Sequence, residues 1–118
     1  MALRLLIVDD NAHFLSAARD LLEREGVTVL GVAGTSTEAL RLAQDLHPDV
    51  VLVDVDLGEE NGFDLAQQLV ADEDGRVVLI SAYPEAEFAD LITASPALGF
   101  VSKSDLSARA VSDLVESA

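Results

Sequence analysis

The sequence of 118 residues contains no cysteine, which excludes disulfide bonds and thiolate metal sites. A chain without cysteine suits a reducing cytoplasm, and we take the cytoplasm as its expected location. The first four residues lead straight into an apolar segment, without the basic region and long hydrophobic core of a signal peptide. The apolar runs have the length of strands, well below the ~20 residues that a membrane span requires.

Basic residues are scarce as well. Acidic residues outnumber them 22 to 7, and the formal net charge is −15. Such a charge repels nucleic acid phosphates and anionic lipid, and it favours cations or basic protein surfaces. We therefore predict that this chain binds neither nucleic acid nor membranes directly. Most of the acids are expected only to keep the surface hydrated, except where they converge on one spot.

Apolar residues, by contrast, make up 50% of the chain and alternate with amphipathic segments. Continuous apolar runs predict buried strands at residues 3–8, 27–33, 50–53, 77–80 and 99–102. Helical spacing predicts helices around residues 14–22, 35–46, 66–70, 85–94 and 106–114. Thr35 and Glu38 form a capping box at the start of the second helix, and a loop rich in glycine and acid is expected at residues 56–62.

Five strand–helix repeats with short connections predict parallel strands joined by right-handed crossovers. The length favours a single domain over residues 1–118. The expected fold is α/β: a flavodoxin-like (βα)5 doubly wound parallel sheet with strand order 2-1-3-4-5. In such a sheet, ligands bind beyond the carboxyl ends of the strands where the strand order reverses, here between the first and third strands.

Reactive side chains follow four of the five predicted strands. These are Asp9 and Asp10, Asp54, Ser81 and Lys103. Any one of them alone is more often a helix cap, a turn former or a solvated base, but together they indicate a site. Crowded carboxylates raise one another's pKa, and Mg²⁺ would relieve this crowding because it prefers carboxylate and water oxygens. Mn²⁺ would suit the same ligands.

Such a site suits a phosphoryl group carried on Asp54. A carboxylate is a chemically competent phosphate acceptor. The metal and Lys103 would neutralise the phosphoryl oxygens from two sides, and phosphoryl transfer depends mainly on such positioning and charge neutralisation.

Four segments, at residues 6–11, 51–62, 80–82 and 99–103, together resemble the receiver domains of two-component response regulators. The resemblance covers essentially the whole chain. It implies that Asp54 is the phosphoacceptor, that Asp10 binds Mg²⁺ directly and that Asp9 acts largely through water. The backbone carbonyl of Asp56 would complete the coordination by the protein.

The resemblance also implies a switch. Ser81 would move inward to hydrogen-bond a phosphoryl oxygen while Lys103 pairs with another, and Phe100 would repack and alter the face formed by helix 4, strand 5 and helix 5. Phe100 as an ordinary core aromatic residue stays an alternative. The implied partner is a sensor histidine kinase or a phosphotransfer protein, and a homodimer through that face is left open. The chain would be a signalling switch, not an enzyme, catalysing only its own phosphorylation and slow dephosphorylation.

Several positions depart from the usual family pattern. Gly58 and Ser104 stand where many relatives have proline, which predicts a more mobile loop at Gly58 and puts in doubt a cis bond before Ser104. The sequence Lys-Ser-Asp-Leu at residues 103–106 resembles receivers joined to helix-turn-helix DNA-binding domains, and so points to transcription regulation. Asp56 and Tyr83 would flank the path of the hydrolytic water, and we expect them to tune the rate of dephosphorylation.

Other functions fit the sequence less well. Asp54-Val55-Asp56 resembles the opening motif of haloacid-dehalogenase-type phosphatases, but no acidic pair follows the fourth strand. A flavin or nucleotide site would need a glycine-rich cradle where Asp9 and Asp10 stand. A pseudo-receiver that is never phosphorylated is the remaining alternative. His13 and His47 are interpreted as structural, and the chain fits either a stand-alone receiver or part of a longer regulator.

Overall fold

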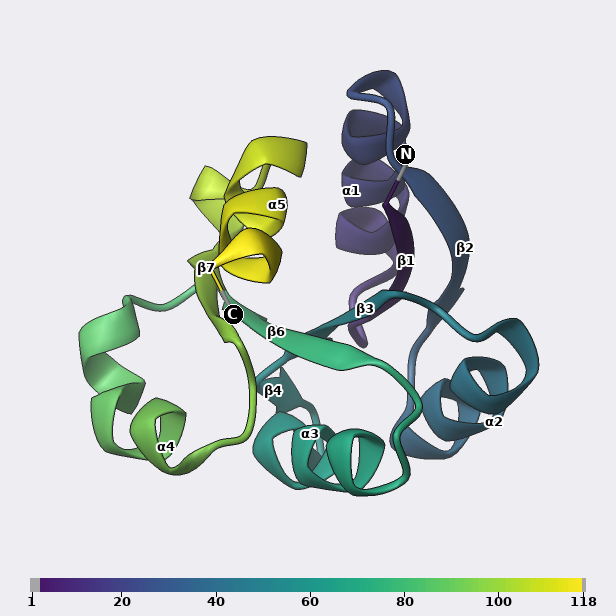
Figure 1. The fold of residues 1–118 in the computed structure, drawn as a ribbon. Coiled ribbons are helices and arrows are strands. Elements are labelled where there is room, and N and C mark those ends of the chain that lie inside the picture. The colour runs from purple at the N-terminus through teal and green to yellow at the C-terminus, as the bar shows by residue number, and fades with distance from the viewer. Residues whose placement is uncertain (1–2, 118) are drawn as a thin grey trace.

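The computed structural model describes residues 3–117. Five parallel strands form one sheet, in the order β2 (Thr28–Ala33), β1 (Arg4–Val8), β3 (Val50–Asp54), β6 (Arg76–Ser81) and β7 (Gly99–Ser102). This confirms the predicted order 2-1-3-4-5, because β6 and β7 are the fourth and fifth strands of the main sheet. Helices cover both faces, as Figure 1 shows.

The helices alternate with the strands along the chain. They are α1 (Ala12–Arg24), α2 (Ser36–Leu46), α3 (Gly62–Ala71), α4 (Ala89–Ala94) and α5 (Ala108–Glu116). Helices α1 and α5 lie on one face of the sheet, and α2, α3 and α4 lie on the other (Figure 1). Within residues 3–117, no helix has the length and hydropathy needed to cross a membrane.

The two faces of the sheet carry separate hydrophobic clusters. Consecutive strand residues point to opposite faces, so Leu6 and Val53 pack with α2 and α3, whereas Leu5 and Leu52 pack with α1 and α5. All five residues of β3 are buried. A strand buried on both faces is continuously apolar, and this is why the sequence predicted its position so closely.

Side-chain caps explain where most helices begin. The Asn11 side chain accepts a hydrogen bond from the Phe14 amide at the start of α1, and Thr35 Oγ1 accepts one from the Glu38 amide at the start of α2. The capping box predicted at α2 is present with one difference. Glu38 Oε1 accepts from the amide of Gly34, one residue before the cap, instead of from that of Thr35.

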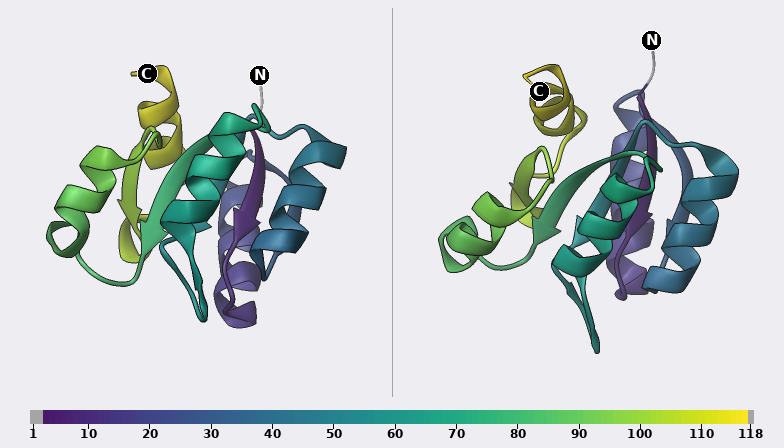
Figure 2. Two further views of the ribbon diagram at one scale, coloured as in Figure 1. Left: turned by 90° about the horizontal axis from the view of Figure 1, so that it is seen from below. Right: turned by 60° about the horizontal axis from the view of Figure 1, so that its bottom comes forward.

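Two segments differ from the predicted elements. The expected helix at residues 85–94 is a 3-10 turn, η1 (Glu85–Phe88), followed by the six-residue α4, because few of its side chains face the core and none of those in η1 and α4 is buried. The expected loop at residues 56–62 contains a short antiparallel hairpin of β4 (Asp56–Leu57) and β5 (Glu60–Asn61). In Figure 2 this hairpin projects beyond the carboxyl ends of the main strands.

A glycine lets the chain turn tightly behind Asp54. A Cβ on Gly62 would collide with the carbonyl oxygen of Asp54 and lie 2.8 Å from its carbonyl carbon. The amide of Gly62 donates to the carbonyl of Val55 at 3.0 Å. Only glycine permits this approach of α3 to the end of β3, and the approach closes the loop that borders Asp54.

Candidate functional site

The site lies at the carboxyl ends of β1, β3, β6 and β7, where the strand order reverses. A hollow of about 140 Å³ opens there, and all the predicted site residues except Phe100 line it. The lining residues are Asp9, Asp10, Asn11, Asp54, Asp56, Ser81, Ala82, Tyr83 and Lys103. Residues from four separate strand ends therefore meet in one place, as the topology predicted.

Lys103 is the residue that joins the acids. Its Nζ lies 2.6 Å from Oδ2 of Asp9 and donates a hydrogen bond of 3.0 Å to Oδ2 of Asp54. Only 17% of the Lys103 side chain is exposed. One ammonium group thus holds two carboxylates from neighbouring strands in a largely buried ion pair.

The backbone arranges the other oxygens of these acids. Asp9 Oδ1 accepts from the Asn11 amide at 2.8 Å, and Asp54 Oδ1 accepts from the Asp56 amide at 3.1 Å. Each carboxylate therefore has one oxygen held by the loop after its strand and the other turned toward Lys103. Both side chains are oriented before any ligand binds.

Carboxylate oxygens of Asp9, Asp10 and Asp54 all lie within 4.8 Å of one another. Asp9 is fully buried and Asp54 is 5% exposed, whereas Asp10 lies at the exposed rim. This set of hard oxygen donors with spare acceptor capacity can hold a divalent cation such as Mg²⁺.

Burial and ion pairing shift the pKa values of Asp54 and Lys103 in opposite directions. Burial outweighs pairing at Asp54, whereas pairing outweighs burial at Lys103. Burial raises the pKa of the Asp54 carboxyl from 3.8 to about 6, against the lowering effects of the Asp56 amide and of Lys103. Burial would lower the pKa of Lys103, but its pairing with Asp9 and Asp54 outweighs this and raises the pKa above 10.5. Lys103 is therefore cationic at neutral pH, while Asp54 is held close to its titration range.

Ser81 and Tyr83 form the wall of the hollow on the β6 side. Ser81 is 1% exposed, and its Oγ accepts a hydrogen bond of 3.0 Å from the Tyr83 amide. The side chain of Tyr83 is 55% exposed. A buried hydroxyl group and an exposed ring thus stand beside the carboxylates, where the sequence placed them.

Phe100 lies apart from the hollow. Its ring is half-buried in β7, and its centroid is 6.4 Å from that of Phe88. Phe100 also lines a second, larger groove between η1 and α5. It is therefore neither fully enclosed in the core nor in contact with the reactive groups.

One contact of the site was not predicted from the sequence. Nζ of Lys103 lies 4.3 Å from the centroid of the Phe14 ring, within the range of a cation–π interaction. The sequence indicated only that Phe14 belongs to the helix predicted around residues 14–22. The sequence could have indicated this contact, because Phe14 lies in the first turn of the helix that follows Asp10. That turn begins at the edge of the sheet that carries the site.

Gly58 contributes to the shape of the rim. Its φ is +74°, a left-handed conformation that proline, with φ near about −65°, cannot adopt. A Cβ at residue 58 would lie 3.1 Å from Oδ2 of Asp10. A proline at residue 58 would therefore require a different path of the loop. Between residues 3 and 117 no peptide bond is cis, including the bond before Ser104.

The two histidines stay outside the site. His13 is exposed in the first turn of α1 and does not line the hollow. His47 ends α2 in a left-handed conformation with φ of 51°.

A model of the response regulator receiver domain family matches residues 5–114. The chain is 31% identical over 103 residues to the response regulator GacA of Pseudomonas aeruginosa, covering 86% of this chain and 48% of that protein. It is 32% identical over 83 residues to the chemotaxis protein CheY of Thermotoga maritima, covering 70% of this chain and 69% of that one. The chain spans about half the length of several curated relatives that it matches.

Solved structures are similar over almost the full chain. A two-component response regulator of the LuxR family from Aurantimonas superposes with a TM-score of 0.84 at 27% identity, covering 98% of this chain and 87% of that one. The signal receiver domain of a modulated diguanylate cyclase from Desulfovibrio desulfuricans gives a TM-score of 0.83 at 30% identity, covering 100% of this chain and 94% of that one.

Proposed function

The chain belongs to the family of response regulator receiver domains, and from this we propose that it is a switch controlled by phosphorylation of Asp54. An oxygen of the Asp54 carboxylate attacks the phosphorus atom of a phosphohistidine on a sensor histidine kinase or a phosphotransfer protein. The P–N bond breaks, and the imidazole leaves with the electron pair. The product is an aspartyl phosphate within a single receiver domain over residues 1–118.

The observation that carries the proposal is the shared contact of Lys103 with Asp9 and Asp54. Before transfer, the ammonium group holds the acceptor carboxylate in place. After transfer, the charge of Asp54 is spread over the phosphoryl oxygens, and Lys103 pairs with one of them. The same cation therefore orients the nucleophile and neutralises the product.

The acids fit Mg²⁺ by the chemistry of their donors, because carboxylate oxygens of Asp9, Asp10 and Asp54 lie within 4.8 Å of one another. Asp10, Asp54 and the backbone carbonyl of Asp56 would hold the ion, with Asp9 acting largely through water. Mn²⁺ suits the same ligands. When bound, the ion would supply positive charge that neutralises phosphoryl oxygens together with Lys103.

Ser81 and Phe100 would transmit the phosphorylation of Asp54 to the surface of the protein. Ser81 Oγ accepts a hydrogen bond from the Tyr83 amide, and its own proton is available to a phosphoryl oxygen. Movement of Ser81 toward that oxygen frees space into which the half-buried ring of Phe100 can turn. The face made by α4, β7 and α5 then changes shape. Some curated relatives are named as transcriptional regulatory proteins and others as a chemotaxis protein or protein-glutamate methylesterases. Transcription regulation is the output that we propose, because the Lys-Ser-Asp-Leu sequence at residues 103–106 points the same way.

The test is direct phosphorylation. The chain is incubated with Mg²⁺ and acetyl phosphate and then examined by intact mass for one added phosphoryl group. We expect a metal-dependent adduct that Asp54→Asn abolishes. Asp45→Asn, which removes an exposed acid of α2, is the matched control and should be phosphorylated normally.

A pseudo-receiver is the alternative outcome. If the wild-type chain formed no adduct, and if beryllofluoride with Mg²⁺ left its amide NMR spectrum unchanged, the phosphoryl chemistry would be wrong. The chain would then work through its surface alone.

A further inference from the structure

The β4–β5 hairpin, which projects beyond the main sheet in Figure 2, is held at two points, one on each of its strands. On β4, the side chain of Leu57 is 4% exposed and packs in the hydrophobic cluster with α2 and α3. On β5, Oε1 of Glu60 accepts a hydrogen bond of 3.0 Å from the backbone amide of Ser36, the first residue of α2. The second contact ties the hairpin to an element 24 residues away in the chain.

The amide of Ser36 needs an acceptor from outside its own helix. The first four amides of an α-helix have no partner within the helix, and the capping oxygen of Thr35 is bonded to the amide of Glu38. The positive end of the helix dipole also favours a carboxylate at this place. The Glu60 carboxylate therefore satisfies the start of α2 and fixes the hairpin in the same contact.

The hairpin carries groups that belong to the reactive site. The amide of Asp56 donates to Oδ1 of Asp54 at 3.1 Å, and the backbone carbonyl of Asp56 is a proposed ligand of the ion. At the tip, a Cβ on Gly58 would lie 3.1 Å from Oδ2 of Asp10, so the tip packs closely against the acid at the rim. Movement of the hairpin would therefore displace the carbonyl of Asp56 and change the surroundings of Asp10.

We infer that Glu60 is a positioning residue for the divalent cation, because its bond to the Ser36 amide holds the hairpin in the conformation that binds the ion. The inference rests on the metal site of the proposed function, and Glu60 itself does not line the hollow. The apparent affinity for a ligand falls in proportion to the fraction of molecules that are in the binding conformation. One exposed hydrogen bond can change that fraction by about 3- to 5-fold.

A proline at residue 36 tests this bond without removing a charge. Proline has no amide hydrogen and is well tolerated at the first position of a helix. Thr35 before it has φ of −139° and ψ of 162°, an extended conformation that a following proline permits. Ser36→Pro therefore removes the donor and should leave α2 intact. Ser36→Ala keeps the amide and is the matched control.

Mg²⁺ is titrated into each isotope-labelled protein without any phosphodonor, and the affinity is measured from the amide NMR shifts of residues 9–11 and 54–58. We expect Ser36→Pro to weaken Mg²⁺ binding by about 3- to 5-fold. It should also lower the NMR order parameters of residues 58–60, because the hairpin loses one of its two anchors. Ser36→Ala should bind Mg²⁺ as the wild type does.

Two further variants separate the hydrogen bond from the charge of its acceptor. Glu60→Ala removes the acceptor together with a negative charge, whereas Glu59→Ala removes the same charge from the neighbouring exposed residue. We expect Glu60→Ala to weaken Mg²⁺ binding more than Glu59→Ala does. In the Ser36→Pro protein the two substitutions should have equal effects, because the bond is already lost.

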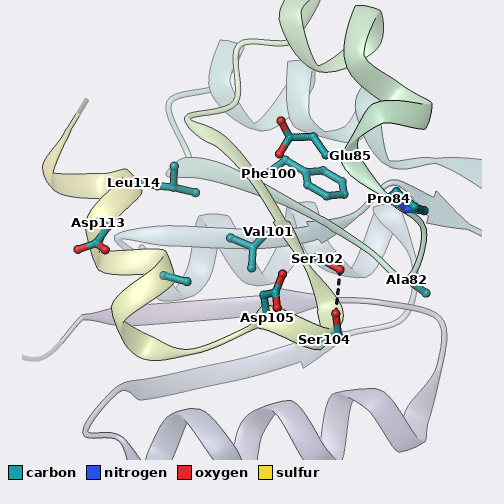
Figure 3. Close-up of a pocket in the computed structure, with 11 residues that line it drawn as sticks. Ala82, Pro84, Glu85, Phe100, Val101, Ser102, Ser104, Asp105, Asp113 and Leu114 are labelled. Carbon is teal, nitrogen blue, oxygen red and sulfur yellow. Dashed lines mark hydrogen bonds between the residues drawn. The ribbon is translucent and has the colours of Figure 1, made fainter.

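The groove between η1 and α5 provides an internal control for the fold. None of residues 56–61 lines it, and Figure 3 shows Phe100 of β7 and Leu114 of α5 among the residues that do. Before Mg²⁺ is added, the amide signals of Phe100 and Leu114 should coincide in the wild type and in all variants. Phosphorylation of Ser36→Pro by acetyl phosphate should be slow at limiting Mg²⁺ and reach the wild-type rate at saturating Mg²⁺, which a general loss of structure would not produce.

Equal Mg²⁺ affinities of Ser36→Pro and Ser36→Ala would overturn the inference. Equal weakening by Glu60→Ala and Glu59→Ala would reduce the effect to charge and overturn it as well, as would a wild-type chain that binds no Mg²⁺. A wild-type chain that binds Mg²⁺ but forms no phosphoryl adduct would refute the proposed phosphoryl transfer, and the Mg²⁺ affinities would still decide the role of Glu60.

Discussion

Replacing Asp54 by asparagine should make the metal-free protein more stable at neutral pH. The raised pKa of Asp54, about 6 against 3.8 for the free group, means that the folded chain binds the proton more tightly than the unfolded chain. Stability therefore falls as the pH rises from about 4 to about 6, and above this range the ionised carboxylate costs free energy. Two pKa units correspond to at most about 3 kcal/mol.

The observed gain should be smaller than that limit. The pKa of about 6 already includes the pairing of Asp54 with Lys103. The asparagine side chain would keep the size of the aspartate, but its single oxygen can accept from only one of the Asp56 amide and Lys103, and this loss opposes the gain. We expect Asp54→Asn to raise the free energy of unfolding by about 1–2 kcal/mol at about pH 7.5. At about pH 4.5 the variant's advantage should be about 2 kcal/mol smaller and should therefore disappear, because the wild-type carboxyl is then largely protonated in the folded state.

Urea denaturation followed by circular dichroism, in EDTA, measures the difference at both pH values. Mg²⁺ should then reverse it, because an ion that binds the wild-type site stabilises the folded chain by mass action and the Asp54→Asn variant binds it less well. Asp45→Asn is the control and should stay within about 0.5 kcal/mol of wild type at both pH values. A variant less stable than wild type at neutral pH, or a difference independent of pH, would refute the reasoning.

Three further outcomes can be checked on the same protein. Phe14→Leu should slow phosphorylation by acetyl phosphate about 2- to 5-fold and remove the ring-current shift of the Lys103 methylene protons. Phe14→Tyr should keep the rate and the shift near their wild-type values. An unchanged shift in the leucine variant would contradict the contact between Phe14 and Lys103. Glu73 has a φ of 57°, so Glu73→Gly should raise the free energy of unfolding by about 0.5–1 kcal/mol in urea denaturation, and a loss of stability would show that the turn is not strained. Asp56→Asn and Tyr83→Ala should change the rate at which the phosphoryl adduct is lost by hydrolysis. If both variants lost the adduct at the wild-type rate, these two residues would not tune dephosphorylation.

Much of the fold could be predicted because its signals are local. Buried parallel strands such as β3 are continuous apolar runs, and caps such as Thr35 mark the starts of helices. Prediction was weakest at α4, where few side chains face the core, and at the β4–β5 hairpin, whose two short strands have no apolar pattern. These elements depend on their neighbours for their shape.

The sequence by itself determined the order of elements and the reactive residues at the strand ends, because the carboxyl ends of parallel strands must meet at one edge of the sheet. Only the tertiary structure decided which of Asp9 and Asp10 is buried and pairs with Lys103. Two adjacent, identical side chains point in different directions from the end of β1, so one is fully buried against Lys103 and the other is exposed. The contact of Phe14 with Lys103 was decided in the same way. It joins residues far apart in the chain, and only packing determines that they meet.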